Sequence, residues 1–284
     1  MKSLPLTLLL SLSLTAVIDF RCTSNPFSKD KITPSHQIVK GTVRLNDGSD
    51  PGGVFVWLEQ LDISTRTDST GAFSLEIPAP QTQPGGGING VYRLYYYVAN
   101  YQIAASATAI VKGSFVYGEE NIDSNGNIKP AIVMKKLFDI DTKVTPTIFP
   151  HDSTGYILIY ISLYNIQKAT EIIWFINRAN QTLASIALKE VGAADEETVL
   201  VQQSIWTETQ LLSSDTVLSM HLFSREFSLP PGKYQVIPYL FIEQENLPPK
   251  LLQSLGRCYD IYHWHTDYLK IPFKQNIGYL TIVE

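Results

Sequence analysis

The sequence lacks any cluster of Lys and Arg residues. Its 22 basic residues are spread along 284 positions and are outnumbered by 27 acidic residues, which gives a formal net charge of −5. A protein that binds nucleic acid needs a basic stripe on one face, so we expect no nucleic-acid partner. Charged residues are scarce at 17% of the chain, while hydrophobic residues make up 44%. This composition is typical of folded domains rather than of extended disorder.

Recognisable catalytic motifs are lacking as well. The chain contains no Gly-x-Ser-x-Gly nucleophile elbow and no phosphate-binding loop. None of its 5 histidines begins a His-x-x-Glu or His-Glu-x-x-His zinc motif. We therefore expect a protein without enzymatic activity and without a cofactor.

Long hydrophobic runs are absent except at the N-terminus. After the basic start MKS, residues 4–18 read LPLTLLLSLSLTAVI. This run has the length of a signal-peptide core and is too short for a membrane span. We expect an exported protein, with a signal peptide over residues 1–22 and a polar tether over residues 23–36.

Cys22, in the string IDFRCTSNPF, follows the apolar run directly. The order of apolar core, cysteine and small polar tether resembles a bacterial lipoprotein signal. Asp19 and Arg21 depart from that pattern, which favours Leu and then Gly or Ala at these positions. The resemblance implies a lipid on Cys22 that anchors the protein to a membrane of the cell envelope.

Two alternatives for this cysteine stay open. Cleavage by an ordinary signal peptidase after Ala16 would leave Cys22 as a plain thiol, and the protein would be periplasmic or secreted in soluble form. An unacylated Cys22 can also pair with Cys258, the only other cysteine, because exported chains form disulfides.

Strict alternation of apolar and polar side chains predicts strands throughout the first half of the chain. The segments that alternate are QIVKGTVRL, AFSLEI and VYRLYYYVA, and the apolar run in VFVWLEQ is interpreted as a further strand. The side chains expected to face inward are Val39, Gly41, Val43, Leu45, Val54, Val56, Leu58, Phe73, Leu75, Ile77, Tyr92, Leu94, Tyr96 and Val98.

The stretch TRTDSTGAFSLEIP, residues 65–78, predicts a hairpin turn followed by an anchor residue. Asp68 and Thr70 can bond loop amides, and Gly71 can take a positive φ without steric cost. Phe73 then enters the core as the next strand begins.

The same region resembles a carboxypeptidase regulatory-like domain over residues 37–136. The matching features are VKGTV, a Gly-Val opening of the second strand, a Tyr-rich strand ending in NYQI, the closing NGNIKPAIVMKK, and the turn residues Thr67, Asp68, Gly71 and Phe73. The resemblance implies a transthyretin-like β-sandwich, an accessory module that does not itself perform catalysis.

The second half of the chain also reads as strands. Residues 137–155 are rich in Thr, Pro and Asp and are interpreted as a junction. The segment YILIYISLYN then places Ile157, Ile159, Ile161 and Leu163 on one face. A Pro-Pro-Gly-Lys turn before the strand KYQVIPYLFIE resembles the last hairpin of immunoglobulin-like sandwiches. Only LPPKLLQSLGRC and ADEETVLVQQSI suit short helices.

These patterns predict an all-β protein with two β-sandwich domains. The first is carboxypeptidase regulatory-like, over residues 37–136, and the second is immunoglobulin-like, over residues 156–284.

The string YDIYHWHTDY, residues 259–268, carries two candidate sites. On a strand, His263, His265 and Asp267 would share one side, where three ligands can hold a metal ion and leave one position open. The other interpretation is a solvated strand or loop without a metal ion.

The aromatic residues of this string form the second candidate. Tyr259, Tyr262, Trp264 and Tyr268 can make an exposed patch that binds a sugar or a partner protein. Packing of these rings on the domain's own core is the favoured alternative.

The sequence thus favours an exported, membrane-tethered, non-catalytic binding or assembly lipoprotein of the cell envelope. Its expected partners are the membrane, through Cys22, and an envelope protein or a glycan. Two other functions stay open: a metal-dependent hydrolase that uses His263, His265 and Asp267, and a structural subunit of an envelope complex.

Overall fold

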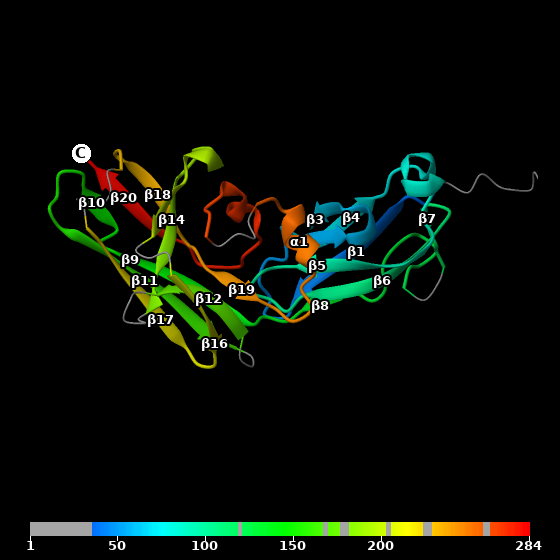
Figure 1. Cartoon of the computed structure of the whole chain (residues 1–284), viewed down its shortest axis with the longest axis horizontal. Helices are drawn as coiled ribbons and strands as arrows, with labels where there is room; N and C mark the ends of the chain where they lie inside the picture. Colours follow the sequence, from blue (N-terminus) through cyan, green and yellow to red (C-terminus); the bar gives the residue numbers. More distant parts are fainter. Residues whose placement is uncertain are drawn as a thin grey trace, which may run out of the picture. The chain divides into compact units, whose positions relative to one another are not determined.

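Strands make up almost all of the regular secondary structure in the computed structural model, so the fold class is all-β, as predicted (Figure 1). The structure describes residues 36–118, 121–166, 170–176, 182–202, 206–223, 229–257 and 262–284. The predicted signal peptide with Cys22, most of the tether, Cys258 and Tyr259 lie outside these residues. Within the described ranges, no helix has the length and apolar character that a bilayer span requires.

The first part of the chain forms two sheets. One has the strand order β4-β1-β8, and the other has the order β3-β2-β5-β6-β7. The bounds are β1 Ile38–Leu45, β2 Phe55–Leu58, β3 Ile63–Arg66, β4 Ala72–Glu76, β5 Gly90–Tyr97, β6 Ala104–Val111, β7 Ser114–Phe115 and β8 Ile132–Met134.

The two sheets pack on each other around one apolar core. Val39 and Val43 of β1 are completely buried in this core, together with Leu75 of β4 and Leu94 of β5. Burial of such a side chain contributes about 1.5–3 kcal/mol. The predicted inward side chains of these strands are buried in this core, except Tyr92, which is half-buried and packs against it.

At Gly41 of β1 there is no room for a side chain. It lies opposite Phe73 of β4 in the antiparallel register. A Cβ added at Gly41 would lie 2.6 Å from the Phe73 ring. The glycine thus makes room for the anchor residue that the sequence predicts.

The second part of the chain forms three sheets. Their strand orders are β10-β20-β18-β14-β15, β17-β11-β9 and β13-β12-β16, and β19 pairs with β12. The bounds are β9 Phe138–Thr145, β10 Ile148–Pro150, β11 Tyr156–Asn165, β12 Thr170–Ile176, β13 Thr182–Leu183, β14 Ser185–Glu190, β15 Val199–Gln202, β16 Trp206–Leu212, β17 Thr216–Phe223, β18 Gly232–Pro238, β19 Phe241–Glu243 and β20 Gly278–Val283.

Two predictions for this part are corrected. The segment interpreted as a junction forms strands β9 and β10, and Phe138, Ile140 and Val144 of β9 are buried at alternate positions. The segment ADEETVL holds only a 3-10 turn, Asp195–Glu197, before β15 begins. The other predicted helix is present as α1, Pro249–Ser254. Burial of Ile157, Ile159, Ile161 and Leu163 on one face of β11 is confirmed.

Strand β2 and the C-terminal half of β5 are buried on both faces of their sheet. Val56, Leu58, Leu94 and Tyr96 point into the first core, as predicted. The side chains that alternate with these point to the opposite face and belong to the core of the second part. Each is less than a tenth exposed: Phe55, Trp57, Tyr95 and Tyr97. Residues 36–284 accordingly form one compact unit.

Candidate functional site

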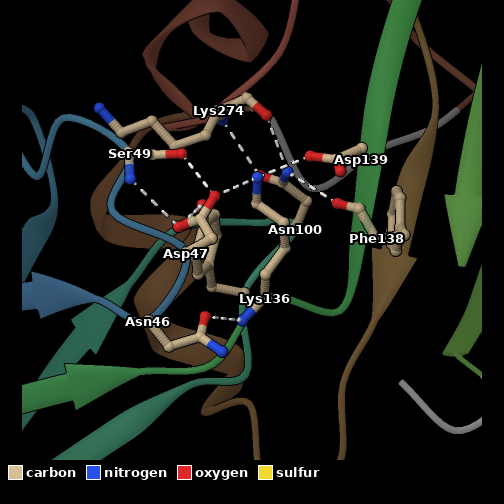
Figure 2. Close-up of polar contacts among 9 residues, drawn as sticks. Asn46, Asp47, Ser49, Asn100, Lys136, Phe138, Asp139 and Lys274 are labelled. Atoms are coloured by element: carbon tan, nitrogen blue, oxygen red, sulfur yellow. Dashed lines mark hydrogen bonds and ion pairs between the residues drawn. The ribbon is translucent and has the colours of Figure 1, made fainter. Parts of the chain in front are cut away.

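A buried lysine joins the two parts of this unit (Figure 2). The Nζ atom of Lys136 contacts the carboxylate of Asp47, in the loop after β1, and lies 2.6 Å from Oδ1 of Asp139 on β9. The Lys136 side chain is only 8% exposed, whereas that of Asp139 is 48% exposed. Asp47 also accepts hydrogen bonds from the Tyr101 hydroxyl at 2.9 Å and from the Ser49 hydroxyl at 2.5 Å.

These contacts keep both partners charged. Burial alone would raise the pKa of Asp47, but hydrogen bonds from Lys136, Ser49 and Tyr101 outweigh burial and lower it. Burial alone would lower the pKa of Lys136, but its bonds to Asp139 and Asp47 outweigh burial and raise it.

Asn100 makes a second connection beside this lysine (Figure 2). Its side chain is completely buried. The Nδ2 atom donates to the carbonyl oxygens of Phe138 at 3.1 Å and Lys274 at 2.8 Å. Its Oδ1 atom accepts from the backbone N–H of Lys274 at 3.0 Å. One side chain thus fixes the backbone of the segment that carries Lys274.

Lys274 lines a hollow of about 390 Å³ next to these contacts. Its wall is made by the loop at Gly52 and Gly53, by Arg66 of β3, by strands β14 and β18, and by the segment that precedes β20. The polar lining residues are Arg66, Lys189, Asp195, Gln235, Lys274 and Gln275, and the larger apolar ones are Ile237, Tyr268, Leu269, Ile271, Phe273 and Ile277. A hollow of this size accommodates a small organic ligand.

Two of the cations at the hollow are bonded to backbone carbonyls instead of carboxylates. Arg66 donates to the carbonyl of Gly53 at 3.1 Å and to that of Lys270 at 2.5 Å. Lys274 donates from Nζ to the carbonyl of Gly52 at 2.6 Å. Within the described ranges, neither cation has an acidic oxygen within the 4.0 Å of an ion pair.

Partial burial changes the proton affinity of both cations. It lowers the pKa of Arg66. It also lowers the pKa of Lys274, and the more distant charges of Asp50 and Asp47 only partly oppose this effect. The third cation of the hollow, Lys189, is paired with Asp195. The site therefore holds two cations whose charge no neighbouring acid neutralises directly.

The predicted turn at Thr67, Asp68, Gly71 and Phe73 positions the edge of this hollow. Thr67 is buried, donates from its hydroxyl to the carbonyl of Pro51 at 2.5 Å, and accepts from the backbone N–H of Val54 at 2.9 Å. These bonds hold the loop of residues 51–54, whose carbonyls bind the two cations.

Within the turn, the carboxylate of Asp68 accepts from the N–H of Thr70 at 2.8 Å, the Thr70 hydroxyl at 2.7 Å and the N–H of Ala72 at 3.0 Å. Gly71 has a φ of +82°. The predicted turn chemistry is therefore present.

The strand on which the metal prediction relied is not formed. Residues 266–270 make a 3-10 helix, so His263, His265 and Asp267 do not alternate along one side of a strand. Asp267 lies 2.9 Å from Nδ1 of His265, 2.5 Å from Nζ of Lys270 and 2.8 Å from the backbone nitrogen of Arg257. In the part of the chain that is described, no three His, Cys, Asp or Glu side chains come together as a metal site.

The predicted aromatic patch is divided between surface and core. Tyr262 is 68% exposed, whereas Tyr268 is only 2% exposed. Trp264 packs on Tyr239 and Tyr268, with ring centroids 5.2 and 5.8 Å apart. The favoured alternative, packing on the core, therefore applies to Trp264 and Tyr268.

Sequence patterns do not identify Arg66, Asn100 or Lys274 as site residues. Asn100 in YVANYQ and Lys274 in IPFKQNIG are single polar residues beside apolar ones, which is a weak signal. Their partners lie up to 222 positions away, so no local pattern could pair them.

Comparison with known proteins adds no homologue: no protein-family model matches the chain, and a search of curated proteins finds no match. The carboxypeptidase regulatory-like and lipoprotein resemblances therefore stay predictions.

Proposed function

We propose that this protein is an exported, membrane-tethered, non-catalytic binding or assembly module of the cell envelope that receives its ligand in the hollow lined by Arg66 and Lys274. One observation carries the proposal. A hollow of about 390 Å³ is lined by two cations whose hydrogen bonds within the described residues go only to backbone carbonyls. Concave sites with an apolar wall and a few fixed polar groups are typical of ligand binding.

The rigidity of the surroundings supports a binding role. The loop that carries Gly52 and Gly53 is held by the buried Thr67, and the segment that carries Lys274 is held by the buried Asn100. A site whose groups are fixed before binding loses less conformational entropy when the ligand arrives.

The tether is proposed from the N-terminal sequence. The apolar run over residues 4–18 and Cys22 directly after it support export and lipid anchoring. The variant Cys22→Ser should leave the membrane fraction and remain folded. Retention of that variant on membranes, with an N-terminus that carries no acyl chain by mass spectrometry, would argue against the anchor.

Binding in the hollow is testable in intact cells. A photo-crosslinking amino acid replaces Gln275, which lines the hollow, and in a matched variant it replaces Lys40, an exposed residue of β1. We expect a discrete adduct from position 275 and none from position 40. Equal adducts from both positions, or none from either, would contradict the proposed function.

A further inference from the structure

The hollow combines a cationic edge with an apolar wall. Arg66 and Lys274 hold the carbonyl oxygens of Gly53 and Gly52, which are consecutive residues. The two cationic groups therefore lie at the same edge of the hollow. The apolar side chains of Ile237 and Phe273 contribute to its wall.

Both cations have donors to spare. A guanidinium carries more N–H groups than the two that Arg66 uses on Gly53 and Lys270, and an ammonium carries more than the one that Lys274 uses on Gly52. Gln235 and Gln275 also line the hollow, and within the described part of the chain their side-chain amides have no hydrogen-bond partner. Several donors are thus available to an incoming acceptor.

The charge balance favours a singly charged ligand. Lys189 is already paired with Asp195, which leaves Arg66 and Lys274 as the cations without a contacting acid. Asp50 and Asp47 act on Lys274 from a distance and reduce its effective positive field. A monoanion can accept charge-assisted hydrogen bonds from the remaining donors of Arg66 and Lys274, and such bonds are roughly twice as strong as neutral ones.

We propose that the hollow binds an organic carboxylate with an apolar body, whose carboxylate lies at Arg66 and Lys274 and whose body packs on Ile237 and Phe273. The inference rests on the proposed binding function and adds the chemical class of the ligand. The amides of Gln235 and Gln275 donate to its remaining polar atoms.

A matched pair of probes tests the charge requirement. The mature protein is titrated by calorimetry with 4-phenylbutanoate and with 4-phenylbutanamide, which have nearly the same shape but differ by one negative charge. Because charge-assisted hydrogen bonds are roughly twice as strong as neutral ones, we expect the carboxylate to bind at least about tenfold more tightly. Inorganic phosphate alone should bind more weakly than the carboxylate, because it has no apolar body.

Matched variants test the two residues. Arg66→Gln and Lys274→Gln should each weaken binding of 4-phenylbutanoate at least about fivefold and weaken binding of the amide by a smaller factor. Lys40→Gln removes the same charge at an exposed position outside the hollow, and its affinity should match that of the unmodified protein. Arg66→Lys and Lys274→Arg keep the charge and should retain more of the affinity than the Gln variants.

Each contrary outcome is distinct. Equal affinity for the carboxylate and the amide would overturn the anionic class, and phosphate binding as tight as the carboxylate would overturn the apolar body. Unchanged binding in both Gln variants would overturn the placement. If a Gln variant fails to fold, the probe pair on the unmodified protein still decides the ligand class. Failure of both probes together with a specific adduct at position 275 would overturn this inference alone, whereas loss of that adduct would overturn the proposed function.

Discussion

Lys136 connects an acid of the first part with an acid of the second part. It reaches both Asp47 and Asp139 while its own side chain is 8% exposed. Removing one member of a buried ion pair is costly because the other member stays buried without a partner. Exposed pairs contribute little. The exposure of each partner therefore determines how much its replacement costs.

We expect Lys136→Met to lower the free energy of unfolding by about 2–4 kcal/mol, because Asp47 is only 23% exposed and loses its cation. Asp139→Asn, at a side chain that is 48% exposed, should cost less than about 1 kcal/mol. Urea denaturation of the purified variants measures both. Equal costs would show that burial of the ion pair has no special role. The double variant Lys136→Met, Asp47→Asn should recover part of the loss.

The same residues predict how stability depends on pH. The folded pKa of Asp47 lies below its ordinary value of 3.8, so its contribution is complete above about pH 4 and is lost as the pH falls towards the folded pKa. The folded pKa of Lys136 lies above 10.5, so its contribution is complete below that pH and is lost as the pH rises through the folded pKa. Thermal melts should therefore show a smaller acid dependence below pH 4 for Lys136→Met than for the unmodified protein. An identical slope would contradict the assignment to this pair.

At the scale of elements, the turn between β3 and β4 fixes both a strand register and the edge of the hollow. Gly71 has a φ of +82°, and its N–H bonds to the carbonyl of Asp68 at 2.9 Å. A Cβ at this position would overlap the carbonyl oxygen of Val43 in the neighbouring strand β1. Gly48 has a similar φ of +77° but no atom within 4 Å of a Cβ placed there. Comparing substitutions at these two glycines therefore distinguishes the cost of backbone strain from the cost of steric overlap.

We expect Gly71→Ala to destabilise the protein by at least about 2 kcal/mol more than Gly48→Ala, which carries only the left-handed backbone cost of about 1–2 kcal/mol. Chemical denaturation of the two variants gives the difference. A similar loss of stability in both would mean that β1 adjusts freely to the added methyl group.

At the scale of the whole molecule, the two parts meet at β2 and the C-terminal half of β5, which are buried on both faces. Four aromatic side chains of these strands point away from the first core and pack in the second: Phe55, Trp57, Tyr95 and Tyr97. Separating the two parts would expose these rings and the buried side chain of Asn100 to water. The hydrophobic cost of exposing a large side chain is about 1.5–3 kcal/mol, so the parts should unfold together.

Calorimetry should accordingly show one transition for residues 36–284, with the van't Hoff enthalpy close to the calorimetric enthalpy. A fragment of residues 37–136 should bind a hydrophobic dye and aggregate, because the rings of Phe55 and Trp57 become exposed. Two resolved transitions, or a soluble and dye-negative fragment, would show that the first part is independent.

The sequence by itself determined the fold class and the core-facing side of several strands, including β1, β4 and β11. Val39, Val43 and Leu45 alternate with polar residues, and this alternation is a local property that survives in the sheet. The same alternation in β9, at Phe138, Ile140 and Val144, was obscured by the Thr, Asp and Pro residues around it. Burial of both faces of β2 was not visible either, because the run FVWL gives no alternation between apolar and polar side chains.

Only the tertiary structure decided which polar residues make a site. The turn at Thr67 and Asp68 was recognisable because its hydrogen bonds span only a few residues. Arg66 meets the carbonyl of Lys270 across 204 positions, and Lys274 meets that of Gly52 across 222 positions. Such contacts depend on how whole sheets pack, because chain segments so far apart meet only after both have buried their apolar faces. Local periodicity therefore determines where strands form, while packing between sheets forms the hollow and brings the two cations to its edge.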